Sequence, residues 1–131
     1  MSTFTSDIVT MLQNNGFGTI GVDIFVSQDQ PPTPDNILSV TNTGTMQADL
    51  PTIGLSWPTV QIIARGTRGG GQECEERIYK VRDFMKSVGN YAVNDSIFVY
   101  INHLSGPVDI GIDITMRPMY SLNLVCLRTK Y

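Results

Sequence analysis

Within residues 58–88 the spacing between apolar residues changes once. It is two residues before a glycine-rich loop and three or four residues after it. In the first half, PTVQIIARG, the side chains of Val60, Ile62 and Ala64 fall on one face, which predicts a strand. After the loop TRGGG the apolar residues recur as one face of a helix: Cys74, Ile78, Val81, Met85 and Val88. The sequence therefore predicts a strand that a short loop joins to a helix.

The glycine-rich loop could be a phosphate cradle or a flexible connection. Glu73, Glu75 and Glu76 lie in the first helical turn, where they suit the helix dipole but would repel an anion. A P-loop also needs a lysine and then Ser or Thr after its last glycine, whereas Gln72 and Glu73 stand here. We therefore expect no cofactor, and keep a small phosphate- or nucleotide-binding module as an alternative. The expected mobile docking loop consists of Arg68, Gly69, Gly70 and Gly71.

The whole chain, residues 1–131, reads as a single domain. An N-terminal helix is expected, with Thr5 as its N-cap, Phe4 and Val9 as a hydrophobic staple, and Gly16 at its end. Further strands are expected at residues 20–26, 37–44, 96–104 and 120–129, and an extended edge or hairpin tip at 105–119. The expected fold class is α+β: a mostly antiparallel sheet of about four to five strands with two helices packed on one face.

The connection TMQADLPTIGLSW, residues 45–57, is unusually apolar for a loop. It carries Met46, Leu50, Ile53, Leu55 and Trp57. Long connections without regular structure are usually functional or disordered, and exposed apolar patches mark contact surfaces. These residues either fold back onto the core or contact a neighbouring chain.

The charge of the chain is unevenly distributed. The formal net charge is −3, which argues against a general nucleic-acid binder, because such binding depends on Lys and Arg contacts to phosphate. Residues 1–64 contain five acids and no Lys or Arg, whereas residues 65–86 carry six basic and four acidic side chains. This division is compatible with solvated loops beside a mixed-charge helix, or with complementary surfaces of a self-assembling subunit.

The sequence offers no recognisable catalytic or metal-binding motif. Cys74 and Cys126 lack CxxC spacing, so we expect buried or idle thiols, and His103 is the one histidine of the chain. Asp109 and Asp113 resemble an acid–base pair, but nothing in the sequence places a substrate near them, and exposed edge residues explain them better. No stretch has the roughly 18 apolar residues of a membrane span. We expect a protein without catalytic activity, bound metal or membrane contact.

Three segments occur in an order that resembles a known family: NNGFGTIGVDIFVSQDQPPTPDN, then TNTG, then WPTVQIIARG followed by a helix. They resemble phage proteins often labelled minor capsid proteins and grouped with the tail terminators of long-tailed phages. The family has TGG where this chain has Thr43, Gly44 and Thr45, and its helix starts sooner after the strand. The resemblance covers residues 16–88 and, more loosely, the closing strands.

The resemblance implies a structural virion protein of the tail or neck, assembled in the cytoplasm of a bacterial host. Such a protein forms a homohexameric ring at the head-proximal end of the tail tube, terminates tail polymerisation and provides the head–tail joining surface. Its partners would be further copies of itself, the tail tube protein and the head connector or stopper protein. A head-completion or connector protein of the neck is the alternative within the same class.

A ring also suggests roles for two sets of residues. DNA would pass through the channel without specific binding, and acidic side chains lining the wall would repel it and keep it mobile. The channel-lining candidates, among which the sequence does not choose, are Asp23, Asp29, Asp35 and Asp49. The residues expected at or beside the subunit contact are Leu50, Ile53, Trp57 and Arg65.

Overall fold

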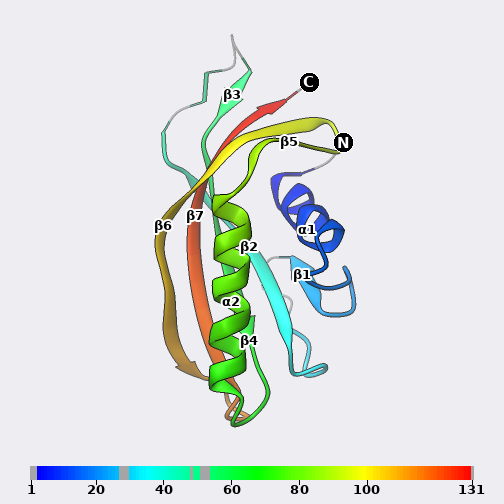
Figure 1. Ribbon diagram of the computed structural model, residues 1–131, viewed down its shortest axis with the longest axis vertical. Helices are drawn as coiled ribbons and strands as arrows, with labels where there is room; N and C mark the ends of the chain where they lie inside the picture. The colour runs from blue at the N-terminus through cyan, green and yellow to red at the C-terminus, as the bar shows by residue number, and fades with distance from the viewer. Residues whose placement is uncertain (1–2, 27–29, 48, 51–53, 131) are drawn as a thin grey trace.

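The structure is a computed structural model that describes residues 3–26, 30–47, 49, 50 and 54–130, without the side chain of Lys130. Helices and strands alternate irregularly along the chain (Figure 1). The elements are α1 (Phe4–Asn14), β1 (Ile24–Val26), β2 (Ile37–Thr45), β3 (Leu55–Ser56), β4 (Pro58–Arg65), α2 (Gly71–Lys86), β5 (Gly89–Val93), β6 (Ser96–Ile112) and β7 (Pro118–Lys130).

The described strands form one seven-stranded sheet in the order β1-β2-β4-β7-β6-β5, with β3 paired to β7 outside this path. The pair β1 and β2 is parallel, and the other pairs are antiparallel. The α+β class with two helices is confirmed, but the expected four to five strands are too few. Strand β3 was missed because two residues are too few to show an alternation. Strand β5 was missed because Gly89, Asn90 and Asn94 are residues typical of a turn.

Both helices bury their apolar sides in one core against the sheet (Figure 1). In α2 the predicted face of Cys74, Ile78, Val81 and Met85 is buried, which confirms the helical period. In the sheet, Leu38 pairs with Ala64 and Val40 with Ile62, so these side chains share the face that the helices cover. Each fully buried Ile or Leu contributes roughly 1.5–3 kcal/mol of transfer free energy. The core therefore fixes both helices on the sheet.

The first helix begins two residues earlier than expected. Its N-cap is Thr3, not Thr5: the Ser6 backbone N–H donates to Thr3 Oγ1 at 3.1 Å, and the Thr3 N–H donates to Ser6 Oγ at 2.9 Å. This reciprocal pair is a capping box built on serine rather than the more common glutamate. Phe4 is consequently the first helical residue, and its ring stacks on Phe98 at 6.1 Å between centroids instead of forming the predicted staple.

A buried ion pair joins α1 to the last strand. The Asp7 carboxylate accepts hydrogen bonds from Asn94 Nδ2 and Ser96 Oγ, each at 2.7 Å, and from Arg128 Nη2. The Arg128 guanidinium also lies over the ring of Phe4, 5.8 Å from its centroid. Asp7 is 0% and Arg128 3% exposed. The pair therefore fastens helix α1, the turn between β5 and β6, and strand β7 at one point.

The longest strands, β6 and β7, form a curved hairpin along the full length of the molecule (Figure 1). The first residues of β6 lie between β5 and β7, so that part is central, as expected. From Ile101 to Ile112, β6 pairs with β7 alone among the described residues. The register shifts several times there, which bends the free edge and discourages pairing with another strand.

Replacing Asp7 with alanine should lower the free energy of unfolding by roughly 3–5 kcal/mol, because Arg128 would stay buried without its counter-charge. Urea unfolding measures this difference. The matched control is Asp83→Ala, which removes the exposed partner of Arg82 at 2.8 Å and should cost less than about 1 kcal/mol. Equal losses in the two variants would show that the buried pair has no special weight.

Candidate functional site

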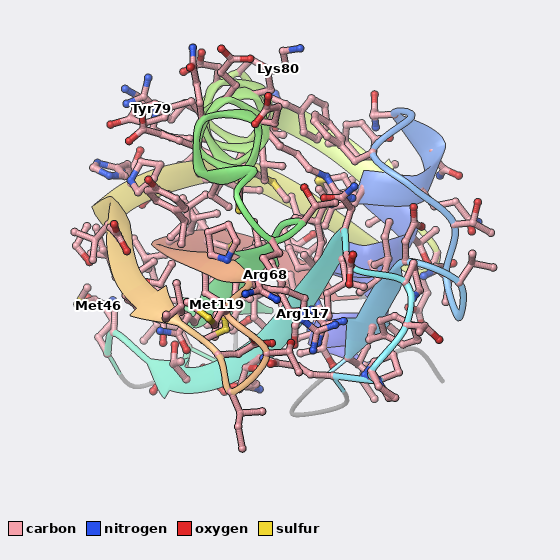
Figure 2. The ribbon with its side chains drawn as sticks, turned by 90° about the horizontal axis from the view of Figure 1, so that it is seen from below. Met46, Arg68, Tyr79, Lys80, Arg117 and Met119 are labelled. Atoms are coloured by element: carbon pink, nitrogen blue, oxygen red, sulfur yellow. The ribbon has the colours of Figure 1, made fainter. Side chains whose placement is uncertain are left out.

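Three connections meet at one end of the sheet, which we call the loop end. Strand β4 ends at Arg65 and β6 ends at Ile112, while β2 and β7 begin at Ile37 and Pro118. The register places Ile37 opposite Arg65 and Arg65 opposite Met119. The connections are the proline loop (residues 30–36), the glycine loop (66–70) and the hairpin turn (113–117). Figure 2 looks onto this end, where Arg68, Arg117 and Met119 gather near the centre.

The side chain of Arg65 binds the backbone of the proline loop. Its guanidinium donates to the backbone carbonyls of Asp35 at 3.1 Å, Pro31 at 2.6 Å and Pro34 at 2.7 Å. Burial, and secondly the nearby charge of Arg117, lower the pKa of Arg65. Its side chain is 2% exposed, so it faces its own loop. Arg65 was expected at or beside the subunit contact. Its effect on such a contact would be indirect, through the proline loop.

Arg117, in the hairpin turn, is a second arginine that binds the proline loop, and no sequence pattern singles it out. It donates to the carbonyl of Pro32 at 2.6 Å and lies 3.3 Å from Asp35 Oδ1. Its Nε also donates to Asp113 Oδ2 at 2.8 Å. The prolines supply no N–H but keep their carbonyls, and two arginines satisfy these acceptors. The proline loop and the hairpin turn are thereby tied together.

The hairpin turn is closed by Asp113. Its Oδ1 accepts from the backbone N–H of Arg117 at 2.9 Å and from the backbone N–H and hydroxyl of Thr115, each at 3.0 Å. These bonds, led by the Arg117 N–H, hold the pKa of Asp113 at about 2. Asp109 Oδ1 accepts from the Gly111 N–H at 2.7 Å. Both carboxylates of the conceivable acid–base pair thus bind local backbone.

The glycine loop forms a tight turn before α2. Gly70 N–H donates to Thr67 O at 2.8 Å, and Gly66 N–H donates to Pro118 O at 2.9 Å. A Cβ on Gly70 would collide with Thr67 Oγ1, and Gly69 has a φ of +79°, so glycine is favoured at both positions. Glu73 lies in the first helical turn, where it disfavours an anion. The mobility expected for Arg68 to Gly71 stays a prediction.

The opposite end of the sheet carries the apolar connection of residues 45–57. Leu50 and Leu55 exchange backbone hydrogen bonds of 2.9 and 3.1 Å, and Met46 N–H donates to Trp57 O at 2.9 Å. Leu50 is exposed and Trp57 half-buried, while Ile53 lies outside the described residues. A cavity of about 440 Å³ opens beside this connection, lined by Gly54, Leu55 and Pro58 and by the polar residues Thr45, Asp49, Ser56 and Arg128.

The acidic channel candidates do not share one site. Asp35 is exposed at the loop end, and Asp49 is exposed at the cavity of the opposite end. Asp23 is half-buried, and its Oδ1 accepts from the Thr19 N–H at 2.6 Å. Asp29 lies outside the described residues. A ring could bring these side chains together only by placing different copies next to each other.

The remaining residues considered for catalysis or metal binding are the two cysteines and His103. Cys74 and Cys126 are buried, as predicted, and burial raises the pKa of the two thiols to about 11 and about 12, respectively. His103 is exposed, and its Nε2 lies against the carbonyl of Gly106. Among the described residues, no group of three or more His, Cys, Asp or Glu side chains could hold a metal ion. In the same part of the chain, no helix is long and apolar enough to cross a membrane.

The family of the chain follows from its match to a family model described as bacteriophage tail terminator protein, which covers residues 11–130. The protein is therefore a structural protein of the bacteriophage tail and a component of the virion. Within that class, the chain belongs to the bacteriophage tail terminator family, which confirms the resemblance seen in its sequence motifs. A comparison with curated proteins finds no match.

Replacing Arg65 with methionine should lower the free energy of unfolding by roughly 1–3 kcal/mol, because the proline-loop carbonyls lose their buried donor. Chemical denaturation followed by tryptophan fluorescence measures the change. Arg68→Met is the matched control: Arg68 lies three residues further on and is exposed, so its loss should stay within about 0.5 kcal/mol. A destabilisation at Arg68 as large as that at Arg65 would contradict the role given to the buried arginine.

Proposed function

We propose that the protein assembles into a homohexameric ring at the head-proximal end of the tail tube, stops tube polymerisation and provides the surface for head–tail joining. The observation that supports this most directly is the family match over residues 11–130. A ring that caps a tube needs one surface for neighbouring copies and others for the tube and the head connector. The chain offers exposed apolar side chains at both ends of its sheet: Met46, Leu50, Ile112, Ile114 and Met116.

The connection of residues 45–57 is the proposed subunit contact. Leu50 and Met46 are exposed there, and Trp57 is half-buried, so a neighbouring copy could bury further apolar area. Ile53 belongs to the same proposal by its place in the sequence. Arg65 contributes indirectly, because it fixes the proline loop rather than facing outward. Such contacts between different surfaces of identical copies are heterologous, and they close into a ring when the rotation between neighbouring copies closes.

The segment Arg68 to Gly71, which consists of the end of the glycine loop and the first residue of α2, is the proposed docking loop for the tail tube or the head connector. Arg68 and Gly69 are exposed at the loop end, and the adjacent turn adds Ile114 and Met116. Interfaces are enriched in arginine and apolar side chains, and both kinds lie together here. A phosphate-binding role is disfavoured at this place by the carboxylate of Glu73 in the first turn of α2.

A phage in which this gene is disrupted should produce full heads beside unattached tails of overgrown or irregular length. Negative-stain electron microscopy of the lysate measures the distribution of tail lengths. Tails of normal length beside heads that leak DNA or fail to join would instead assign the protein to the head side of the neck, as a completion or connector protein.

The same disrupted phage allows variants to be compared by complementation. Leu50→Asp should fail to restore normal tail length, because it places a charge in the proposed contact. Ile20→Asp is a matched control, since Ile20 is 41% exposed against 44% for Leu50 and lies in a different part of the chain. Equal rescue by both variants would show that residues 45–57 are not part of the subunit contact.

We also propose that acidic side chains line the channel and keep DNA mobile during passage. In the variant that tests this proposal, Asp29, Asp35 and Asp49 are all replaced by asparagine. Asp23 is left unchanged because its carboxylate accepts a hydrogen bond from the Thr19 N–H. The triple variant should release DNA several-fold more slowly from completed virions, an effect that added salt reduces. Asp83→Asn on α2 serves as the control. An unchanged rate of DNA ejection in the triple variant would contradict the proposed acidic channel lining.

A further inference from the structure

The turn between β6 and β7 exposes apolar side chains that its own chain does not cover. Ile112, Ile114 and Met116 are 58%, 98% and 50% exposed, and they lie within five residues of each other. We call these three side chains the hairpin tip. Burying one such side chain is worth roughly 1.5–3 kcal/mol. A solvated turn normally carries polar residues, so this tip is suited to contact with another protein surface.

The tip is held rigid before any partner arrives. Asp113 binds the N–H groups of Thr115 and Arg117, and Arg117 is bound in turn to the proline loop. Met116 N–H also donates to Asp113 O at 2.9 Å. A preorganised anchor loses little conformational entropy on binding, so more of its apolar burial appears as affinity.

The cavity at the opposite end is large enough for the tip and has both apolar and polar walls. Its volume is about 440 Å³, and Gly54, Leu55 and Pro58 supply apolar walls. An apolar cavity of about 150 Å³ already holds a benzene molecule, so this one has room for Ile114 and one of its neighbours. Arg128 also lines the cavity, but its charge is balanced by Asp7.

One exposed basic residue beside the tip and one exposed acidic residue at the cavity have opposite charges. Arg68 Nη2 lies 3.6 Å from Met116 Sδ, and Arg68 is exposed. Asp49 lines the cavity and is also exposed. Opposite charges at the rim of an apolar contact fix its register and speed association.

The tip cannot reach the cavity of its own copy. Ile112 pairs with Pro118 at the start of β7, and Leu55 pairs with Thr129 near its end. Eleven residues of β7 separate these positions, a length of roughly 35 Å at about 3.3 Å per residue. Tip and cavity are therefore two different surfaces that can meet only between copies.

We propose that the hairpin tip of one copy inserts into the cavity of the next copy, with Arg68 facing the neighbour's Asp49. The contact is heterologous, since each copy offers a tip to one neighbour and a cavity to the other, and contacts of this kind build a ring when the rotation between copies closes. This inference rests on the proposed ring and names the surfaces that build it. It assigns Arg68 and the hairpin tip to the contact with the next copy, in place of the contact with the tail tube or the head connector proposed above.

Cross-linking within virions tests the contact. A phage carries the double variant Ile114→Cys/Ser56→Cys, and purified virions are treated with a short bismaleimide. The native Cys74 and Cys126 are buried with raised pKa values, so they contribute little background. We expect a ladder of covalent oligomers on denaturing gels, at least tenfold above either single variant. Lys80→Cys/Ser56→Cys is the control, because Lys80 is exposed on α2, away from the loop end's centre (Figure 2).

Two results would overturn the inference. One is the absence of a ladder in virions whose tails have normal length, which would leave the terminator function intact. The other is cross-linking of Ile114→Cys alone, to itself or to the tail tube protein. The proposed function fails separately, if disruption of the gene leaves tail length unchanged.

A charge exchange covers the case in which the cysteine variants give no virions. Arg68→Asp and Asp49→Arg should each lower the phage titre at least tenfold, and the two together should restore it to within about threefold of the unmodified phage. A combined variant no better than the poorer single variant would overturn the pairing of Arg68 with Asp49. Both residues are exposed, so their exchange should leave folding intact.

Discussion

The ion pair between Asp7 and Arg128 determines how the two ends of the chain meet. The residues lie 121 positions apart, and their contact fixes α1 against the end of β7. The Asp7 carboxylate receives three donors, whereas Arg128 Nε is buried without a hydrogen-bond partner among the described residues. The pair therefore keeps part of the desolvation cost of a buried charge. Arg128 also lines the cavity at the end of the sheet. The position of the first helix and the shape of that cavity therefore depend on the same pair.

The parts of the fold that could be predicted are those specified by local periodicity. Strand β4 and helix α2 have long, regular patterns of apolar residues, and the structure confirms both. The N-cap of α1 was misplaced because Thr3 and Thr5 are both good capping residues, and the choice of Thr3 depends on the hydroxyl of Ser6. Strands β3 and β5 are short, and tertiary pairing rather than intrinsic pattern defines them.

The candidate site was predictable in composition but not in arrangement. The apolar connection and the glycine loop were both visible in the sequence, yet nothing there shows that they lie at opposite ends of one sheet. Arg65 was expected near a subunit contact, whereas its guanidinium turns to backbone carbonyls some 30 residues away in sequence. Arg117 was missed because its partners in the proline loop lie more than 80 residues away. Such long-range polar contacts leave no periodic trace in a single sequence.

The hydrogen bonds of Arg65 and Arg117 to the proline loop determine how the loop end responds to pH. Their hydrogen bonds go mainly to backbone carbonyls, which do not titrate. A guanidinium stays protonated in proteins, and Asp113, the carboxylate that supports Arg117, has a pKa of about 2. Acidification to mildly acid pH therefore removes none of these bonds. The backbone contacts that shape the loop end therefore do not depend on the protonation of a side chain in mildly acid solution.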